Sequence, residues 1–239
     1  MKIINVGNRI MNTYVYQAPR GLVMIDTGYE NSLRSVEKKL ASYKIPVSEI
    51  KYIFLTHAHD DHAGFLNELL GKCPDVRVIV NPASIPVLRM GQNRFDGGCS
   101  SRLAYLFCKA MSLVGNGQHR FPPIEDRYLD RLLQITPENK EQIEYELGGK
   151  ILFTPGHTND SISLKVNGCV FCGDAAMNGF PSIHRVTIWV ENIEDFQRSW
   201  ELLIAENAER LMPAHGNPFP IGDLEKNLNK VSKIKLRKL

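Results

Sequence analysis

The chain lacks the sequence features that would direct it to a membrane or across one. No apolar run approaches the roughly 18 residues of a spanning helix, and the N-terminal MKIINVGNRI has neither the apolar core nor the cleavage site of a secretory signal. Charge of one sign is also scarce: the formal net charge is +3, which gives no reason to expect a nucleic-acid partner. We therefore expect a cytoplasmic protein with no membrane partner, and we favour a small-molecule substrate over a nucleic acid.

Cysteine is sparse, and its five residues are odd in number and scattered. This pattern does not suit a disulfide framework and agrees with a reducing cytoplasm. Cys169 and Cys172 do form a CxxC pair, which is typical of redox or metal sites. The chain has no second CxxC to complete a zinc site, however, and the preceding Asn167-Gly168 predicts a hairpin turn. We expect both cysteines to be small residues of a core strand.

What is present is an alternation of strand-like and helix-like segments. Residues 13–18, 21–28 and 50–56 are β-rich and apolar, and residues 32–44 carry apolar positions at helical spacing with Ser32 as the expected N-cap. Such alternation predicts an α/β layered domain. The length permits one or two domains, and we expect a single domain over residues 1–239.

Two segments depart from this rhythm. Residues 82–130 look helical or irregular, with Gly and Pro interruptions, and we interpret them as a mainly helical insertion. The tail from Lys226 carries six basic residues and no acid, so it could contact phosphates. We favour a terminal helix that docks through Leu224, Leu228 and Val231 and leaves the basic side chains in solvent.

The densest group of metal-ligating side chains is the sequence THAHDDHAG at residues 56–64. It follows an apolar strand, so His57 and His59, two residues apart in extended chain, point to the same side. Asp61 and His62 follow where a helix can begin. One loop can thus offer two pairs of ligands to two neighbouring metal ions.

Three more candidates share one context: an apolar strand, a Gly or Pro turn, and then a ligand. They are His157 in FTPGHT, Asp174 in VFCGDA and His215 in LMPAHG. Strand ends that meet at one edge of a sheet are where α/β proteins usually build their sites. We expect these side chains to complete the site.

These motifs, together with Asp26 in MIDTG, resemble the ordered motifs of the metallo-β-lactamase superfamily, whose signature is HxHxDH. The resemblance covers residues 3–217 and implies a four-layer αββα sandwich. It also implies two divalent metal ions, with zinc favoured and iron or manganese as alternatives. His57, His59 and His157 would hold the first ion, and Asp61, His62 and His215 the second; Asp174 would bridge the two, and Asp26 would orient the metal loop.

The ligand set predicts a hydrolase. Two ions that share a water molecule lower its pKa and leave a bridging hydroxide as nucleophile, with Asp61 as a candidate to orient it or carry a proton and Asp174 as the bridge. A small ester, thioester, lactone or related substrate is expected. Two alternatives stay open: a phosphodiesterase or nuclease of the same fold, and an oxidoreductase that uses a single iron on persulfides.

Departures from known members narrow the prediction. True β-lactamases lack an aspartate at the position of Asp174, and flavodiiron oxidoreductases have glutamate where this chain has His59. Many acyl-homoserine lactonases have tyrosine where this chain has Met177. The 82–130 insertion is the expected cap over the site. Candidate substrate-binding residues are His119 in this insertion and Met177, Phe180 and His184 after the bridging aspartate.

Overall fold

The computed structural model describes residues 2–115 and 117–239, and this part of the chain forms two compact units. Unit 1 comprises Met1–Asn93 and Arg120–Lys150, and unit 2 comprises Arg94–His119 and Ile151–Leu239. The expected 82–130 insertion is mainly helical, as predicted, and its residues are shared between the two units. Within the described residues, no helix combines the length and apolar character that a membrane span needs.

Unit 1 is built on a mixed sheet with the strand order β1-β2-β3-β4-β5-β7. The first three strands pair antiparallel as a meander, and β3, β4, β5 and β7 pair parallel. Parallel strands bring their carboxyl ends to one edge, which places the loop after β4 at that edge. The strands are β1 (Ile3–Asn5), β2 (Tyr14–Ala18), β3 (Gly21–Ile25), β4 (Ile50–Phe54), β5 (Arg77–Val80) and β7 (Leu132–Gln134).

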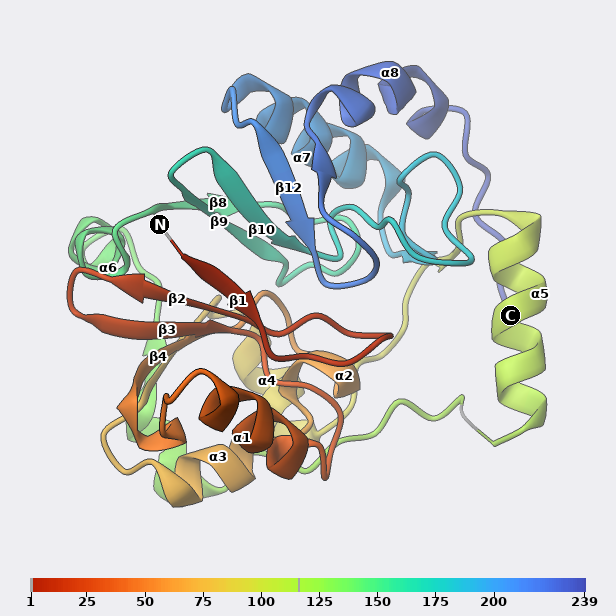
Figure 1. The fold of residues 1–239 in the computed structure, drawn as a ribbon. Coiled ribbons are helices and arrows are strands. Elements are labelled where there is room, and N and C mark those ends of the chain that lie inside the picture. Colours follow the sequence, from red (N-terminus) through yellow and green to blue (C-terminus); the bar gives the residue numbers. More distant parts are fainter. Residues whose placement is uncertain (1, 116) are drawn as a thin grey trace. The chain divides into compact units, whose positions relative to one another are not determined.

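Helices α1 and α3 lie together below this sheet in Figure 1. Leu33 and Leu40 of α1 and Leu69 of α3 are fully buried in one apolar cluster with Ile53 of β4. Helical spacing of apolar residues therefore produces the packed face that the sequence predicts. The helices of this unit are α1 (Leu33–Ser42), α2 (Asp60–Ala63), α3 (Leu66–Lys72), α4 (Ser84–Met90) and α6 (Lys140–Leu147), with short 3-10 turns η1 (Val47–Glu49) and η2 (Asp126–Arg131).

Unit 2 has a second mixed sheet with the strand order β13-β12-β10-β9-β8. β9 and β10 form an antiparallel hairpin, whereas β10 and β12 run parallel, so the ends of β10 and β12 lie next to each other. A small antiparallel pair joins β6 to β11. The strands are β6 (Gly98–Cys99), β8 (Lys150–Phe153), β9 (Ile162–Val166), β10 (Cys169–Gly173), β11 (Trp189–Val190), β12 (Arg210–Pro213) and β13 (Phe219–Pro220).

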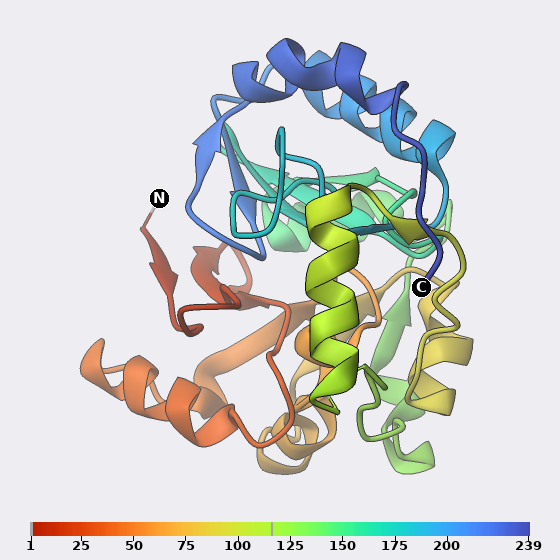
Figure 2. The ribbon, with the colours of Figure 1, turned by 90° about the vertical axis from the view of Figure 1, so that its right-hand side faces the viewer.

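The helices of unit 2 are α5 (Arg102–Leu113), α7 (Ile193–Ala205) and α8 (Gly222–Val231). Helices α7 and α8 lie side by side (Figure 2). Phe196 and Trp200 of α7 are buried in one cluster with Leu224 and Val231 of α8. The predicted terminal helix and its docking residues are thus confirmed, although the helix ends at Val231.

Local predictions had mixed outcomes. The Asn167-Gly168 hairpin is present with both residues at positive φ, and Cys172 is buried while Cys169 is half-buried. Ser32 does not act as the side-chain cap of α1: its backbone is already helical and its hydroxyl donates a hydrogen bond back to the Tyr29 carbonyl. The α/β class is confirmed.

Candidate metal centre

The loop between β4 and α2 carries the unit 1 candidates. His57, His59 and His62 are buried, and Asp61 is half-buried. Gly64 fixes the path of this loop, because a Cβ there would lie 2.4 Å from the backbone nitrogen of Glu30. The loop is therefore held close to the segment after β3, which carries Asp26.

Asp26 organises this loop through hydrogen bonds. Its Oδ1 accepts from the Thr56 backbone N–H at 2.7 Å. Its Oδ2 accepts from the Thr56 hydroxyl at 2.9 Å and lies 2.9 Å from His62 Nδ1. Asp26 has a φ of 57°, a left-handed conformation that Asp tolerates better than most residues. One carboxylate thus fixes both the start of the loop and the ring of His62.

These bonds decide which imidazole nitrogen can bind metal. A carboxylate accepts from His62 Nδ1–H, which leaves the lone pair on His62 Nε2. The Thr56 hydroxyl gives its proton to Asp26, so its oxygen can accept from His57 Nδ1–H at 3.1 Å, which leaves the lone pair on His57 Nε2. His57 Nε2 lies 3.1 Å from His59 Nδ1. The two nitrogens are as close together as two ligands of one ion.

Asn93 is a site residue that the sequence did not reveal. Its side-chain amide lies 3.0 Å from His59 Nε2, and Asn93 is buried. Because amide oxygen and nitrogen are assigned from the network, the oxygen can accept from Nε2–H and leave Nδ1 for metal. Asn93 is 34 residues from His59 in the chain, so no local pattern connects them.

Unit 2 presents three candidates at adjacent strand ends: His157 after β8, Asp174 after β10 and His215 after β12. All three are buried. His157 Nδ1 lies 2.8 Å from the Trp189 carbonyl oxygen, which can only accept. His157 must therefore carry its proton on Nδ1 and present the Nε2 lone pair. Trp189 is a second positioning residue that the sequence did not reveal, because it acts through its backbone.

The two oxygens of Asp174 face different histidines. Oδ2 lies 3.6 Å from His157 Nε2, and Oδ1 lies 3.6 Å from His215 Nε2. These separations exceed those of a direct N–H···O bond. They match the spacing of about 3.4 Å between two ligands that share a tetrahedral ion at about 2.1 Å from each. The geometry of this half of the site therefore fits a carboxylate with one oxygen for each of two ions.

A further carboxyl group lies beside the His157 loop. The backbone N–H of Glu191 donates to the carbonyl of Gly156 at 2.8 Å, and Glu191 Oε2 accepts from the Asn159 N–H at 2.9 Å. Burial, and to a smaller extent the neighbouring Asp160, raise the pKa of Glu191 to about 7. The carboxyl group therefore adds less negative charge to this edge than an exposed glutamate would.

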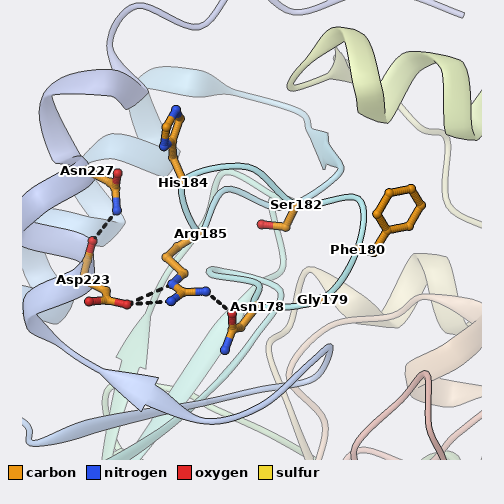
Figure 3. Close-up of a pocket in the computed structure, with 8 residues that line it drawn as sticks. All are labelled: Asn178, Gly179, Phe180, Ser182, His184, Arg185, Asp223 and Asn227. Carbon is orange, nitrogen blue, oxygen red and sulfur yellow. Dashed lines mark hydrogen bonds and ion pairs between the residues drawn. The ribbon is translucent and has the colours of Figure 1, made fainter.

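The candidate substrate-binding residues do not gather in one place. Phe180 and His184 line a hollow of about 430 Å³ in unit 2, together with Arg185 and other polar residues (Figure 3). Met177 is buried, and its N–H donates to the Arg185 carbonyl. His119 is exposed, and its ring centroid lies 5.0 Å from that of Phe95, with the two rings tilted by 42°. The roles of these residues remain predictions.

The donor set is therefore one that can hold metal. In the described chain, the ligand atoms of His57, His59, Asp61, His62, His157, Asp174 and His215 are histidine nitrogens and carboxylate oxygens, which suit zinc, iron or manganese. Neutral imidazoles with fixed tautomers and a carboxylate between two imidazoles agree with that use.

Known proteins resemble this chain in sequence. The family model described as "Metallo-beta-lactamase superfamily" matches residues 6–215. A metallo-beta-lactamase fold-containing protein of Sulfurisphaera tokodaii is 30% identical over 201 residues, which cover 81% of this chain and 69% of that protein. A beta-lactamase-like protein 2 homolog of Drosophila melanogaster is 23% identical over 222 residues, which cover 91% of this chain but 63% of that protein. The chain thus spans less than two thirds of the length of this animal relative.

Solved structures agree on the fold. The archaeal superfamily protein from Sulfolobus tokodaii superposes with a TM-score of 0.66 at 23% identity, covering 95% of this chain and 85% of that one. A metallo-beta-lactamase family protein from Thermus thermophilus gives a TM-score of 0.68 at 18% identity, covering 97% of this chain and 78% of that one. The family match spans the whole set of motifs from Asp26 to His215, and the chain therefore belongs to the metallo-β-lactamase superfamily and has its fold.

Proposed function

We propose that the protein is a metal-dependent hydrolase of a small ester, thioester, lactone or related substrate. The observation that carries the proposal is the Asp174 carboxylate, whose two oxygens face the Nε2 atoms of His157 and His215 at equal distances. Membership in a superfamily whose model spans both sets of ligands supports it.

In this proposal each ion takes ligands from the loop between β4 and α2 and from the segments that follow β8, β10 and β12. His57, His59 and His157 would hold one ion, Asp61, His62 and His215 the other, and Asp174 both. Two divalent ions would supply Lewis acidity, which lowers the pKa of water toward neutrality and polarises the scissile carbonyl group.

The chain's own residues orient the ligands and move protons. Asp26, Thr56 and the Trp189 carbonyl hold imidazole rings in the tautomers described above. Asp61 is half-buried, and its Oδ1 lies 3.7 Å from His62 Nε2. The other oxygen of this carboxylate is the candidate to take a proton from water and pass it to the leaving group.

Metal analysis and a substrate panel test the proposal together. Purified protein loaded with zinc, iron or manganese should hold close to two ions per chain and hydrolyse at least one member of a panel of thioesters, lactones and phosphodiesters. Asp174→Ala should lose both ions and all of that activity, whereas Asp60→Ala, at the variable position of the signature, should keep both. Absence of bound metal after reconstitution, or full activity in Asp174→Ala, would contradict the proposal.

An oxidoreductase is the second candidate. A nitric oxide reductase of Moorella thermoacetica is 24% identical over 142 residues, which cover 58% of this chain and 34% of that protein. If the chain is instead the single-iron oxidoreductase that the sequence leaves open, the purified protein should carry iron and consume oxygen with a persulfide substrate. Bound zinc, together with hydrolysis and no oxygen consumption, would support the hydrolase instead.

A further inference from the structure

The hollow of unit 2 has a chemistry of its own. It is formed by the loop after Asp174 and by α8, and it is lined by Asn178, Gly179, Phe180, Ser182, His184, Arg185, Asp223 and Asn227 (Figure 3). Its volume of about 430 Å³ is that of a small-molecule site. Apart from Phe180, the side chains that line it are polar.

Two of the residues that line this hollow, His184 and Arg185, have a strained backbone conformation. His184 and Arg185 are consecutive residues at φ 60° and 69°, within a tight turn closed by the pairing of Ile183 with Val186. Two-residue turns of this kind favour Asn-Gly, since both central positions need positive φ. A bulky pair such as His-Arg costs conformational energy, and strain of this type clusters at functional sites.

Arg185 is fixed in place and still has donors to spare. Its Nε and Nη2 donate to Asp223 Oδ2 at 3.0 and 2.7 Å, its Nη1 donates to Asn178 Oδ1, and the group lies over the Phe219 ring. Arginine has five N–H groups, so two of them have no partner within residues 2–115 and 117–239. The guanidinium is therefore pre-oriented and can still bind a planar or tetrahedral oxyanion.

His184 adds a donor through Lys230. The Lys230 ammonium lies 3.1 Å from His184 Nδ1 and, since it has no lone pair, it must donate. Nδ1 must accept, so the proton of the neutral ring lies on Nε2, which becomes a donor. Lys230 gives a second hydrogen bond to Asn227 Oδ1 at 2.8 Å, which leaves one ammonium hydrogen without a partner in the described chain.

The carboxylate and amide oxygens of the lining already contact basic side chains. Asp223 Oδ2 takes both bonds from Arg185, and its Oδ1 lies 3.8 Å from the Lys226 ammonium. One acid thus faces two basic side chains, Arg185 and Lys226, and a third, Lys230, contacts His184 and Asn227 of the lining. The surplus is of donors and of positive charge, and we propose that this hollow binds a small oxyanion, a phosphate or carboxylate group of a small molecule.

The site also touches the metal-ligand segment of unit 2. The Asn178 N–H donates to the His215 carbonyl at 3.0 Å, and a Cβ on Gly216 would lie 2.2 Å from the Asn178 carbonyl carbon. An anion bound by Arg185 and His184 would therefore contact a loop that packs against Gly216, the residue after the predicted ligand His215. Binding stands on its own geometry, whether or not the hydrolase proposal holds.

Calorimetric titration of the metal-loaded protein tests the proposal. The probes are inorganic phosphate, glycerol 3-phosphate and citrate, with glycerol as the neutral control. His184→Gly and Lys230→Ala should each weaken anion binding about tenfold or more, the value of one charge-assisted hydrogen bond. Lys233→Ala, an exposed lysine just beyond α8, should bind as the wild type does.

Each outcome of the titration supports or overturns the proposed anion site. Preference for the two phosphates identifies a phosphate site, and preference for citrate identifies a carboxylate site. Anion binding that is unchanged in both His184→Gly and Lys230→Ala belongs elsewhere, such as at the metal ions, and overturns the proposal. Equal binding of glycerol, or no binding tighter than about 10 mM in the wild type, also overturns it. The melting temperature of His184→Gly, expected to be unchanged or raised because glycine relaxes the turn, verifies that this variant folds.

Discussion

At the scale of single residues, Asp26 shows how one side chain couples stability to metal binding. Asp26→Ala removes the acceptor of the Thr56 N–H and of His62 Nδ1–H and places alanine at a φ of 57°. We expect the free energy of unfolding to fall by about 2–4 kcal/mol, from an unsatisfied buried N–H and left-handed strain. Metal affinity should fall by about 10–100-fold, because His62 loses its orientation. Denaturant unfolding and metal titration measure the two effects.

The matched control is Asp26→Asn, which keeps the shape and tolerates the left-handed conformation. It should recover most of the stability and little of the metal affinity, since an amide has one acceptor oxygen for three donors. Equal stability of Asp26→Ala and the wild type would show that the hydrogen bonds of Asp26 contribute little.

Cys108 provides a second test at this scale. Burial, and then the neighbouring Cys99, raise the pKa of the Cys108 thiol to about 12. The thiolate is the reactive form, so at pH 8 alkylation of Cys108 in the folded protein should be at least about a hundredfold slower than in urea-unfolded protein. Between pH 8 and pH 11 the folded rate should rise with pH. Peptide mass spectrometry after timed iodoacetamide treatment measures it, and equal folded and unfolded rates would contradict the burial.

At the scale of elements, the turn after β8 depends on a glycine. Gly156 has a φ of 130°, and a Cβ there would lie 2.3 Å from the Phe196 backbone nitrogen, in the first turn of α7. Gly156→Ala should therefore lower the free energy of unfolding by about 3 kcal/mol or more and displace His157. Gly115→Ala is the control, because its φ is 83° but a Cβ there would meet nothing within 4 Å. It should cost about 1 kcal/mol. Similar losses for the two variants, measured by denaturant unfolding, would show that strain alone acts at Gly156.

The elements were predictable where the signal is local. The apolar runs of β3, β4 and β10 and the helical spacing of Leu33 and Leu40 gave the right element types, and the candidate ligands do lie at strand ends. Contacts between distant segments were not predictable. Asn93 and the Trp189 carbonyl reach histidines more than 30 residues away, and residues 94–119 join unit 2 while the flanking chain joins unit 1. Periodicity records which face of an element is buried but not which segment covers it.

At the scale of the whole molecule, each unit has its own apolar core and its own set of candidate ligands. Two arrangements are consistent with this: each unit binds its own ion, or the two units share both ions, as we propose. Single substitutions of the histidine ligands cannot separate them, since each would lose one ion under either arrangement. Pairs of substitutions can separate them, because the effects of two substitutions on metal content are not additive when both remove ligands of the same ion.

Under the shared arrangement, His59→Ala and His157→Ala each leave one ion per chain, and the double variant still keeps one, because both ligands serve the same ion. His59→Ala combined with His215→Ala leaves none. If each unit held its own ion, the first double variant would also leave none, since it removes a ligand from each unit. Metal content by mass spectrometry of the desalted proteins distinguishes the cases. Thermal unfolding supplies a second readout: an ion at 100 times its Kd stabilises by about 2.7 kcal/mol. Chelation by EDTA should therefore still lower the melting temperature of the first double variant and leave that of the second unchanged.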